Sequence, residues 1–225
     1  MATDQVLALA ALVALAVGLC WLEVRRARAA RAARDGLFDT VLEVLDETRL
    51  CTGPDRYPAL TGQHRGQPVR VEAIVDTLTP RKLPILWLFV TIRRPFGLDT
   101  PVDALARPIG TEFFSPNASF GHRLPTPADF PVHARIATAR PTVLAPAALD
   151  TLGELMRDPK VKEVQAGPTG ARIVYQLAEA AQGPYRTGRR ADFGAPRLEP
   201  CTLARLLDGL AALAEALPPE RARSL

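Results

Sequence analysis

The most distinctive pattern along the chain is an uninterrupted apolar run near its start. Residues 6–22 read VLALAALVALAVGLCWL, seventeen residues without a charged side chain. At about 1.5 Å per residue, a helix over this run would span about 26 Å, close to the lower end of what crosses a bilayer core of about 30 Å. The run therefore predicts one transmembrane helix, although an Ala-rich helix buried in a globular core would show a similar pattern.

Basic residues gather directly after this run. An indole at its end favours the membrane–water interface, and positively charged flanks stay on the cytoplasmic side. A cleaved signal peptide would instead place positive charge before the run, where residues 1–5 carry none. Residues 1–35 are thus predicted to be a single-pass inner-membrane helix with a basic flank, holding the rest of the chain in the cytoplasm. The flank comprises Trp21, Arg25, Arg26, Arg28, Arg31 and Arg34.

Beyond residue 35 the apolar positions change between helical and strand spacing. Apolar residues at helical spacing predict an amphipathic helix over about 37–48, and two alternating stretches, 57–61 and 69–77, predict a hairpin with its turn at Gly62–Gly66. Residues 83–92, LPILWLFVTI, are almost wholly apolar. Ten residues are too few to cross a bilayer, so this run predicts the central buried strand of a sheet.

The second half repeats the alternation. We expect a helix over 145–157 with Pro146 in its first turn, a hairpin of 162–166 and 171–177, and a helix over 200–217 that ends before two prolines. The proline-rich stretch between 93 and 141 contains one extended piece, 132–137. Hairpins flanked by helices predict an α+β domain over 36–219, an antiparallel sheet with packed helices, followed by a tail at 220–225. A helix followed by a hairpin occurs at 37–77 and again at 145–177, which leaves an internal duplication open.

Composition excludes more functions than it suggests. The net charge of +4 arises mainly from residues 23–35, so the remaining chain shows no concentrated basic face of the kind that binds nucleic acid. The three cysteines are far apart, the three histidines lack helical pairing, and no phosphate-binding glycine loop or catalytic motif occurs. No metal, cofactor or nucleic acid is therefore predicted, and the sequence gives no positive reason to expect an enzyme.

Two segments carry candidate chemistry. The loop 110–131 holds four phenylalanines together with Glu112, Ser119 and His122. One interpretation is a hydrolase that uses His122 as base and Ser119 as nucleophile; the other is a loop that packs its aromatic rings onto the sheet. The second segment places Arg186, Arg189 and Arg190 beside a tyrosine, which suits phosphate, carboxylate or lipid headgroups, or else a charged edge strand that resists aggregation.

Several short stretches support a resemblance. Leu60-Thr61-Gly62, Arg65-Gly66 and Val69, then Arg81-Lys82-Leu83-Pro84 and Lys162-Glu163-Val164, resemble a group of uncharacterised bacterial membrane-anchored proteins. The resemblance implies one N-terminal span, a short basic flank and an α+β domain, and it implies no activity or site residues. Together these patterns predict a membrane-tethered, non-enzymatic domain that binds a ligand or a protein partner, with a hydrolase or a binder of anionic lipid or phosphate as alternatives.

Overall fold

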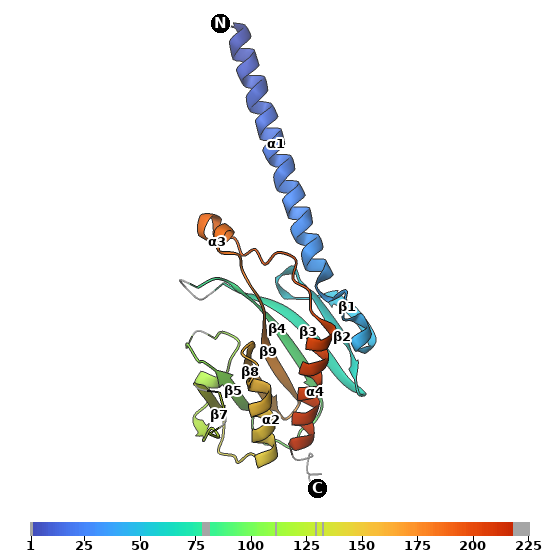
Figure 1. Cartoon of the computed structure of the whole chain (residues 1–225), viewed down its shortest axis with the longest axis vertical. Helices are drawn as coiled ribbons and strands as arrows, with labels where there is room; N and C mark the ends of the chain where they lie inside the picture. Colours follow the sequence, from blue (N-terminus) through green and yellow to red (C-terminus); the bar gives the residue numbers. More distant parts are fainter. Residues whose placement is uncertain (1, 78–81, 111, 129, 132, 218–225) are drawn as a thin grey trace.

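The computed structural model of the chain describes residues 2–77, 82–110, 112–128, 130–131 and 133–217, without the side chains of residues 2, 4, 6 and 8. One long helix, α1 (Ala2–Asp35), projects from an α+β domain (Figure 1). Within the described residues, nine strands form one antiparallel sheet in the order β1-β2-β3-β4-β9-β8-β5-β7-β6. The predicted α+β class is confirmed.

The two predicted hairpins, and the helices predicted over 145–157 and 200–217, lie close to where their patterns place them. The strands are β1 (Asp46–Thr52), β2 (Pro58–His64), β3 (Gln67–Asp76), β4 (Ile85–Arg93), β5 (Val102–Ala106), β6 (His122–Leu124), β7 (Ala134–Thr138), β8 (Val161–Gly167) and β9 (Gly170–Glu179). The other helices are α2 (Pro146–Met156), α3 (Gln182–Gly188) and α4 (Pro200–Ala216), and the 3₁₀ turns are η1 (Gly36–Phe38), η2 (Leu42–Val44), η3 (Pro54–Arg56) and η4 (Asn117–Ser119).

Helices α2 and α4 lie beside each other on one face of the sheet (Figure 1). Their leucines repeat every three or four residues, so a single apolar stripe of each helix faces the core. Leu203, Leu206 and Leu210 of α4 are fully buried there. We call this the helix face of the sheet and the opposite side its outer face.

Strand β4 is buried on both faces, which explains its unbroken apolar sequence. Leu88 and Val90 point into the helix-face core, while Trp87 and Phe89 belong to a second, smaller cluster with Val174 on the outer face. A strand covered on both sides reads as a continuous hydrophobic run instead of an alternating one. The prediction of a central buried strand at 83–92 is therefore confirmed.

The segment after α1 corrects one prediction. Residues 37–48 form no α-helix; they make η1, η2 and the start of β1. Leu37, Phe38 and Val41 are nevertheless fully buried, as their spacing suggested. The backbone of Leu198 donates to Leu37 O and accepts from Thr40 Oγ1, so this tight turn is held against the segment that leads into α4. Without a helix here, the two helix–hairpin units do not match, and the suggested duplication is not supported.

Over its described residues, the structure contains no helix that is both long enough and apolar enough to cross a bilayer. The predicted span at residues 6–22 is thus not confirmed. The described apolar side chains of α1 are exposed all the same, with Leu7, Leu12 and Leu15 each more than 60% accessible. No other element covers them, because α1 stands clear of the domain along most of its length (Figure 1).

Candidate functional site on the outer face of the sheet

The loop between β5 and β6 covers the outer face. Phe114 from this loop makes edge-to-face contacts with Trp87 and Phe89, at centroid distances of 5.5 and 5.7 Å. Phe113, its neighbour, is half-exposed. The loop therefore packs one of its phenylalanines onto the sheet, as the structural interpretation of the sequence expected.

A β-bulge turns two consecutive residues of β8 toward this loop. Val161 pairs with Tyr175, whereas Glu163 already pairs with Val174, so Lys162 is the additional residue. Side chains of a regular strand alternate between faces, and a bulge locally changes that alternation. As a result Val161 faces the helix-face core, while both Lys162 and Glu163 reach the outer face. In a regular strand, two consecutive side chains would lie on opposite faces.

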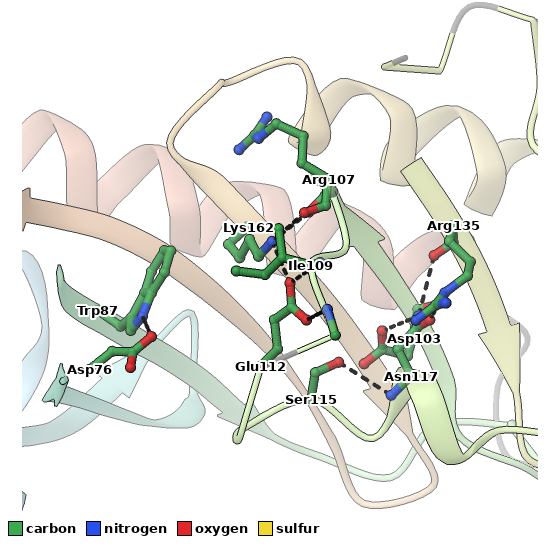
Figure 2. Close-up of polar contacts among 12 residues, drawn as sticks. Asp76, Trp87, Asp103, Arg107, Ile109, Glu112, Ser115, Asn117, Arg135 and Lys162 are labelled. Carbon is green, nitrogen blue, oxygen red and sulfur yellow. Dashed lines mark hydrogen bonds and ion pairs between the residues drawn. The ribbon is translucent and has the colours of Figure 1, made fainter. Parts of the chain in front are cut away.

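Lys162 forms a buried ion pair with Glu112 of the loop, with a distance of 2.8 Å from Nζ to Oε1. The ammonium group also donates to the carbonyl oxygens of Ala106 and Arg107, at 2.9 and 2.8 Å; Figure 2 shows Lys162 between Glu112 and Arg107. The Glu112 carboxylate in turn accepts the backbone N–H groups of Ile109 and Gly110. All three donors of Lys162 are therefore used, and the pair fastens the start of the loop to the sheet.

The two partners of this ion pair respond differently to burial. Burial lowers the pKa of Lys162 from its ordinary value, and the attraction of Glu112 only partly offsets this. For Glu112, burial would raise the pKa, but the hydrogen bond from Lys162 and the N–H of Ile109 outweigh it and lower the pKa. The amine is further disfavoured as a cation by the nearby charges of Arg107 and Lys82.

A pocket of about 230 Å³ opens beside this ion pair. Trp87 and Phe114 form apolar walls, and Lys82 adds an exposed ammonium; Arg107 also lines the pocket, but its guanidinium donates to Pro159 O at 2.8 Å. Asp76 accepts a hydrogen bond from the indole N–H of Trp87 at 3.4 Å. Small-molecule sites combine apolar walls with a few polar groups, and this pocket lies below their usual range of about 300–1,000 Å³. Its size restricts any occupant to a small molecule.

A second polar cluster lies farther along the same face, on β5 and β8. Asp103 and Glu163 are both fully buried. Asn117 of η4 donates through its amide to the carboxylate of Asp103 at 2.6 Å, and its own side-chain oxygen accepts from Arg135. This network ties the middle of the covering loop to β5 and β7 (Figure 2).

Glu163 differs from Asp103 in its hydrogen bonding. Neither of its carboxyl oxygens, nor Asp103 Oδ2, meets a donor from another described residue, so a proton held by Glu163 is what allows a hydrogen bond between the two carboxyl groups. Burial, together with the neighbouring Asp103 carboxylate, raises the pKa of Glu163 to about 9. Burial also raises the pKa of Asp103, against the opposing effects of Glu163, Asn117 and Arg172. At neutral pH the proton of the pair therefore resides on Glu163.

The residues of the predicted hydrolase are not brought together. His122 begins β6 and is exposed, and its ring has no hydrogen bond or ion pair among the described residues. Ser119 lies in η4 and donates to the Pro116 carbonyl of its own turn. Glu112 is paired with Lys162 and makes no hydrogen bond to either residue. The described residues also contain no group of His, Cys, Asp and Glu able to hold a metal ion.

The arginines of the second candidate segment lie on and just after α3, so the suggested edge strand there is wrong. Arg189 stacks over the ring of Tyr185 with its guanidinium 5.4 Å from the centroid, and Arg190 pairs weakly with Asp192 at 3.4 Å. Arg186 remains exposed on the helix. Figure 1 shows α3 at the end of the domain from which α1 projects.

The predicted basic flank forms the second half of α1. Arg25 lies over the ring of Trp21 at 5.2 Å, and Arg26 pairs with Glu23 at 3.0 Å. Arg28 and Arg31 are exposed, while Arg34 is partly buried against the domain. These residues therefore differ: only the last of them contacts the folded part.

Sequence reasoning missed most of the outer-face cluster. The sequence patterns do not point to Asp103; they include Lys162 and Glu163 only in the resemblance, not as site residues, and they indicate Glu112 without its partner. The available signal was weak: Lys162 and Glu163 stand at the start of the predicted strand 162–166, KEVQA, and charged residues in a strand need partners when they are buried.

Comparisons with known proteins add little to this geometry. No known protein family matches the chain, and no curated protein matches it significantly. Among solved structures, the crystal structure of the mycobacterial trehalose monomycolate transport factor A, TtfA, is similar over 80% of each chain, with 11% identity and a TM-score of 0.35. A similarity this distant carries no argument about function.

Proposed function

We propose that this protein is a membrane-tethered binding domain, held at the bilayer by α1 and carrying its ligand site on the outer face of the sheet. The observation behind the tether is the exposed apolar surface of α1. Residues 6–22 lack charge, and the described large apolar side chains of this run, such as Leu7, Leu12 and Leu15, are exposed. Exposed apolar surface of this extent marks a contact with lipid or with a partner.

Two features favour lipid over a protein partner as the cover of α1. The exposed apolar side chains, such as Leu12, Val13 and Leu15, point in several directions around the helix and form no single stripe for a neighbouring helix. The indole of Trp21 and the arginines after it suit the interface between hydrocarbon and water. That five arginines follow the apolar run and none precedes it supports a cytoplasmic position for the domain.

The tether is tested by placing charge inside the apolar run. Leu12→Arg combined with Leu15→Arg is expected to release the full-length chain from membranes washed with alkaline carbonate. An arginine at the centre of a spanning helix costs about 2.5–3.5 kcal/mol on the insertion scale, so two substitutions oppose insertion by about 5–7 kcal/mol. Ala27→Arg with Ala30→Arg is the matched control, since it adds the same charge at the same spacing beyond the run and should leave the chain in the pellet.

Recovery of the unaltered full-length chain in the carbonate supernatant would contradict the tether. The cytoplasmic position is checked separately with protease added to spheroplasts: the domain should be digested only after the spheroplasts are lysed. Digestion in intact spheroplasts would reverse the proposed topology and leave the tether itself standing.

The ligand site we propose is the pocket beside the Lys162–Glu112 pair. Lys162 is saturated by its partners, which leaves it no donor for chemistry and favours binding over catalysis. The exposed ammonium of Lys82, with Trp87 as a wall, suits a small ligand that joins an apolar body to a carboxylate.

Benzoate and benzyl alcohol are a matched pair of probes for this site. In a Trp21→Phe background, which leaves Trp87 as the reporting indole, benzoate should change the emission at lower concentration than benzyl alcohol. Lys82→Met should remove most of that preference, because it removes the exposed ammonium that lines the pocket. An equal response to both probes would show that the pocket does not select carboxylates.

A further inference from the structure

A groove of about 570 Å³ lies where α1 joins the domain. Its walls come from the last two turns of α1, from β1 and from the turn that precedes β2. The groove is amphipathic, because basic side chains stand beside the half-exposed Leu50 and Pro58. The basic residues that line it are Arg31, Arg34 and Arg56, against one carboxylate, Asp35.

The positive charge of this groove is not neutralised from within the protein. Arg31 approaches Asp35 only at 3.7 Å, and both side chains are largely exposed. Neither Arg34 nor Arg56 has a hydrogen bond or ion pair among the described residues, and Arg34 Nε is shielded from solvent without a partner. A buried guanidinium donor without an acceptor is uncommon, since leaving such a donor unpaired costs free energy. The groove thus lacks an acceptor that its basic residues require.

The backbone that presents Arg56 is held in place. Asp55 and Arg56 are both left-handed, with φ of 52° and 62°. Such a conformation costs about 1–3 kcal/mol in a residue other than glycine, so surrounding contacts have to enforce it. The Asp55 carboxylate accepts the backbone N–H of Val75 at 2.8 Å, and the N–H of Tyr57 bonds to Pro54 O at 3.0 Å. These two bonds fix the turn and keep Arg56 at the groove.

The opposite wall is held equally firmly. Directly after α1, Leu37 and Phe38 are fully buried in the core, and Arg197 donates to the carbonyl of Gly36 and to Asp39. The end of α1, and Arg34 with it, therefore has a defined position relative to β1 and β2. Both walls exist before any ligand binds, which avoids the entropic cost of ordering them.

We propose that this groove binds a phosphate-bearing anion, with its guanidinium groups on the phosphate and Leu50 beside an apolar portion. Guanidinium groups match phosphate oxygens in pairs of parallel hydrogen bonds. The lipid source of that phosphate rests on the proposed tether. If the apolar run begins at the far edge of a bilayer core of about 30 Å, the near edge falls close to Arg26. Arg31 and Arg34 then lie about 8 and 12 Å beyond it, at or just past the headgroup layer.

Cys51 provides a reporter at the groove, because this exposed residue is part of the wall opposite α1, where its thiol lies 3.5 Å from Ala59 O. In the full-length Cys20→Ser chain, the remaining thiols are Cys51 and Cys201, and the latter lies on α4 outside the groove. The rate of modification by a neutral maleimide is measured for both thiols. One arm uses lipid discs of phosphatidylcholine with or without phosphatidylglycerol; the other adds inorganic phosphate to the phosphatidylcholine discs.

An occupied groove should slow the modification of Cys51 and leave that of Cys201 unchanged. Protection by phosphatidylglycerol alone identifies the lipid as the source of the phosphate, and equal protection by inorganic phosphate identifies a free anion. Arg56→Gln should weaken the protecting interaction by about 10-fold to 100-fold, as expected for a lost charge-assisted hydrogen bond. Arg28→Gln removes the same charge from an exposed position of α1 that does not line the groove, and should leave protection intact.

Unchanged modification of Cys51 in both arms would overturn the proposal, as would equal effects of Arg56→Gln and Arg28→Gln. Failure of the tether gives a different result, because the chain would then elute apart from the discs. The phosphate arm requires no bilayer and still tests the groove in that case.

Discussion

Glu163 offers the sharpest test of the buried outer-face cluster. Its pKa is raised to about 9 by burial and by Asp103, whereas an unfolded glutamate titrates near 4.5. An acid whose pKa is raised by folding favours the native state at low pH, and that contribution is lost as the pH rises from the unfolded pKa to the folded one. Each pH unit in this window corresponds to about 1.4 kcal/mol. The free energy of unfolding should therefore fall by about 4 kcal/mol between pH 5 and pH 8.

Glu163→Gln should remove this loss, because a glutamine keeps the shape of the protonated acid and does not titrate. Its amide can donate to Asp103 Oδ2, which has no partner among the described residues. We expect the variant to match the unaltered protein near pH 5 and to exceed its stability by about 3 kcal/mol at pH 7, by the same conversion.

Urea unfolding of the full-length chain in mild detergent, followed by circular dichroism at pH 5, 6, 7 and 8, measures this difference. Glu215→Gln, at an exposed position of α4, is the control and should leave the profile unchanged. Parallel profiles for the unaltered protein and Glu163→Gln, offset by a constant amount, would refute the inference that Glu163 takes up a proton on folding.

Two further predictions concern the loop attachment and the β8–β9 hairpin. Glu112→Gln should destabilise the fold by about 3–5 kcal/mol, since it leaves the buried ammonium of Lys162 without its counter-ion. Adding Lys162→Met should recover much of that loss. Urea unfolding of both variants at pH 7 checks this, and a double variant less stable than Glu112→Gln would contradict it. Gly170→Ala should cost about 1–3 kcal/mol in the same assay, because its Cβ would stand 2.5 Å from the carbonyl oxygen of Ile92, whereas Gly167→Ala across the turn meets nothing within 4 Å and should be tolerated.

The spacing of apolar residues along the chain identified the elements that are buried on one face or on both faces. The leucines of α4 predicted its bounds to within a residue or two, since a long amphipathic stripe has few alternative conformations. The same reasoning failed at 37–48, where buried side chains occur at helical spacing along 3₁₀ turns. Spacing alone records which residues enter the core; it does not record which backbone path brings them there.

The strand β5 and the outer-face cluster lay beyond such reasoning for a different reason. Asp103 lies in a five-residue strand that is buried throughout. In a sequence, a charged residue within a short apolar stretch argues against a buried strand unless the partner of the charge is known. That partner, Asn117, comes from a loop without periodicity. The bulge at Lys162 is equally hidden, because one additional residue in a strand leaves no compositional trace. Pairings that depend on tertiary contact become visible only in the folded chain.

The continuity of α1 into the domain has a geometrical consequence. The helix runs without a break from Ala2 to Asp35, and the next residues are fixed in the core. Each residue added to or removed from its middle would therefore rotate the whole domain by about 100° around the helix axis and shift it by about 1.5 Å. The length of α1 therefore sets the orientation of the domain about the helix axis. One inserted alanine would turn α3 and the junction groove to a different side of that axis. An insertion of seven residues, close to two full turns, would nearly restore the original orientation.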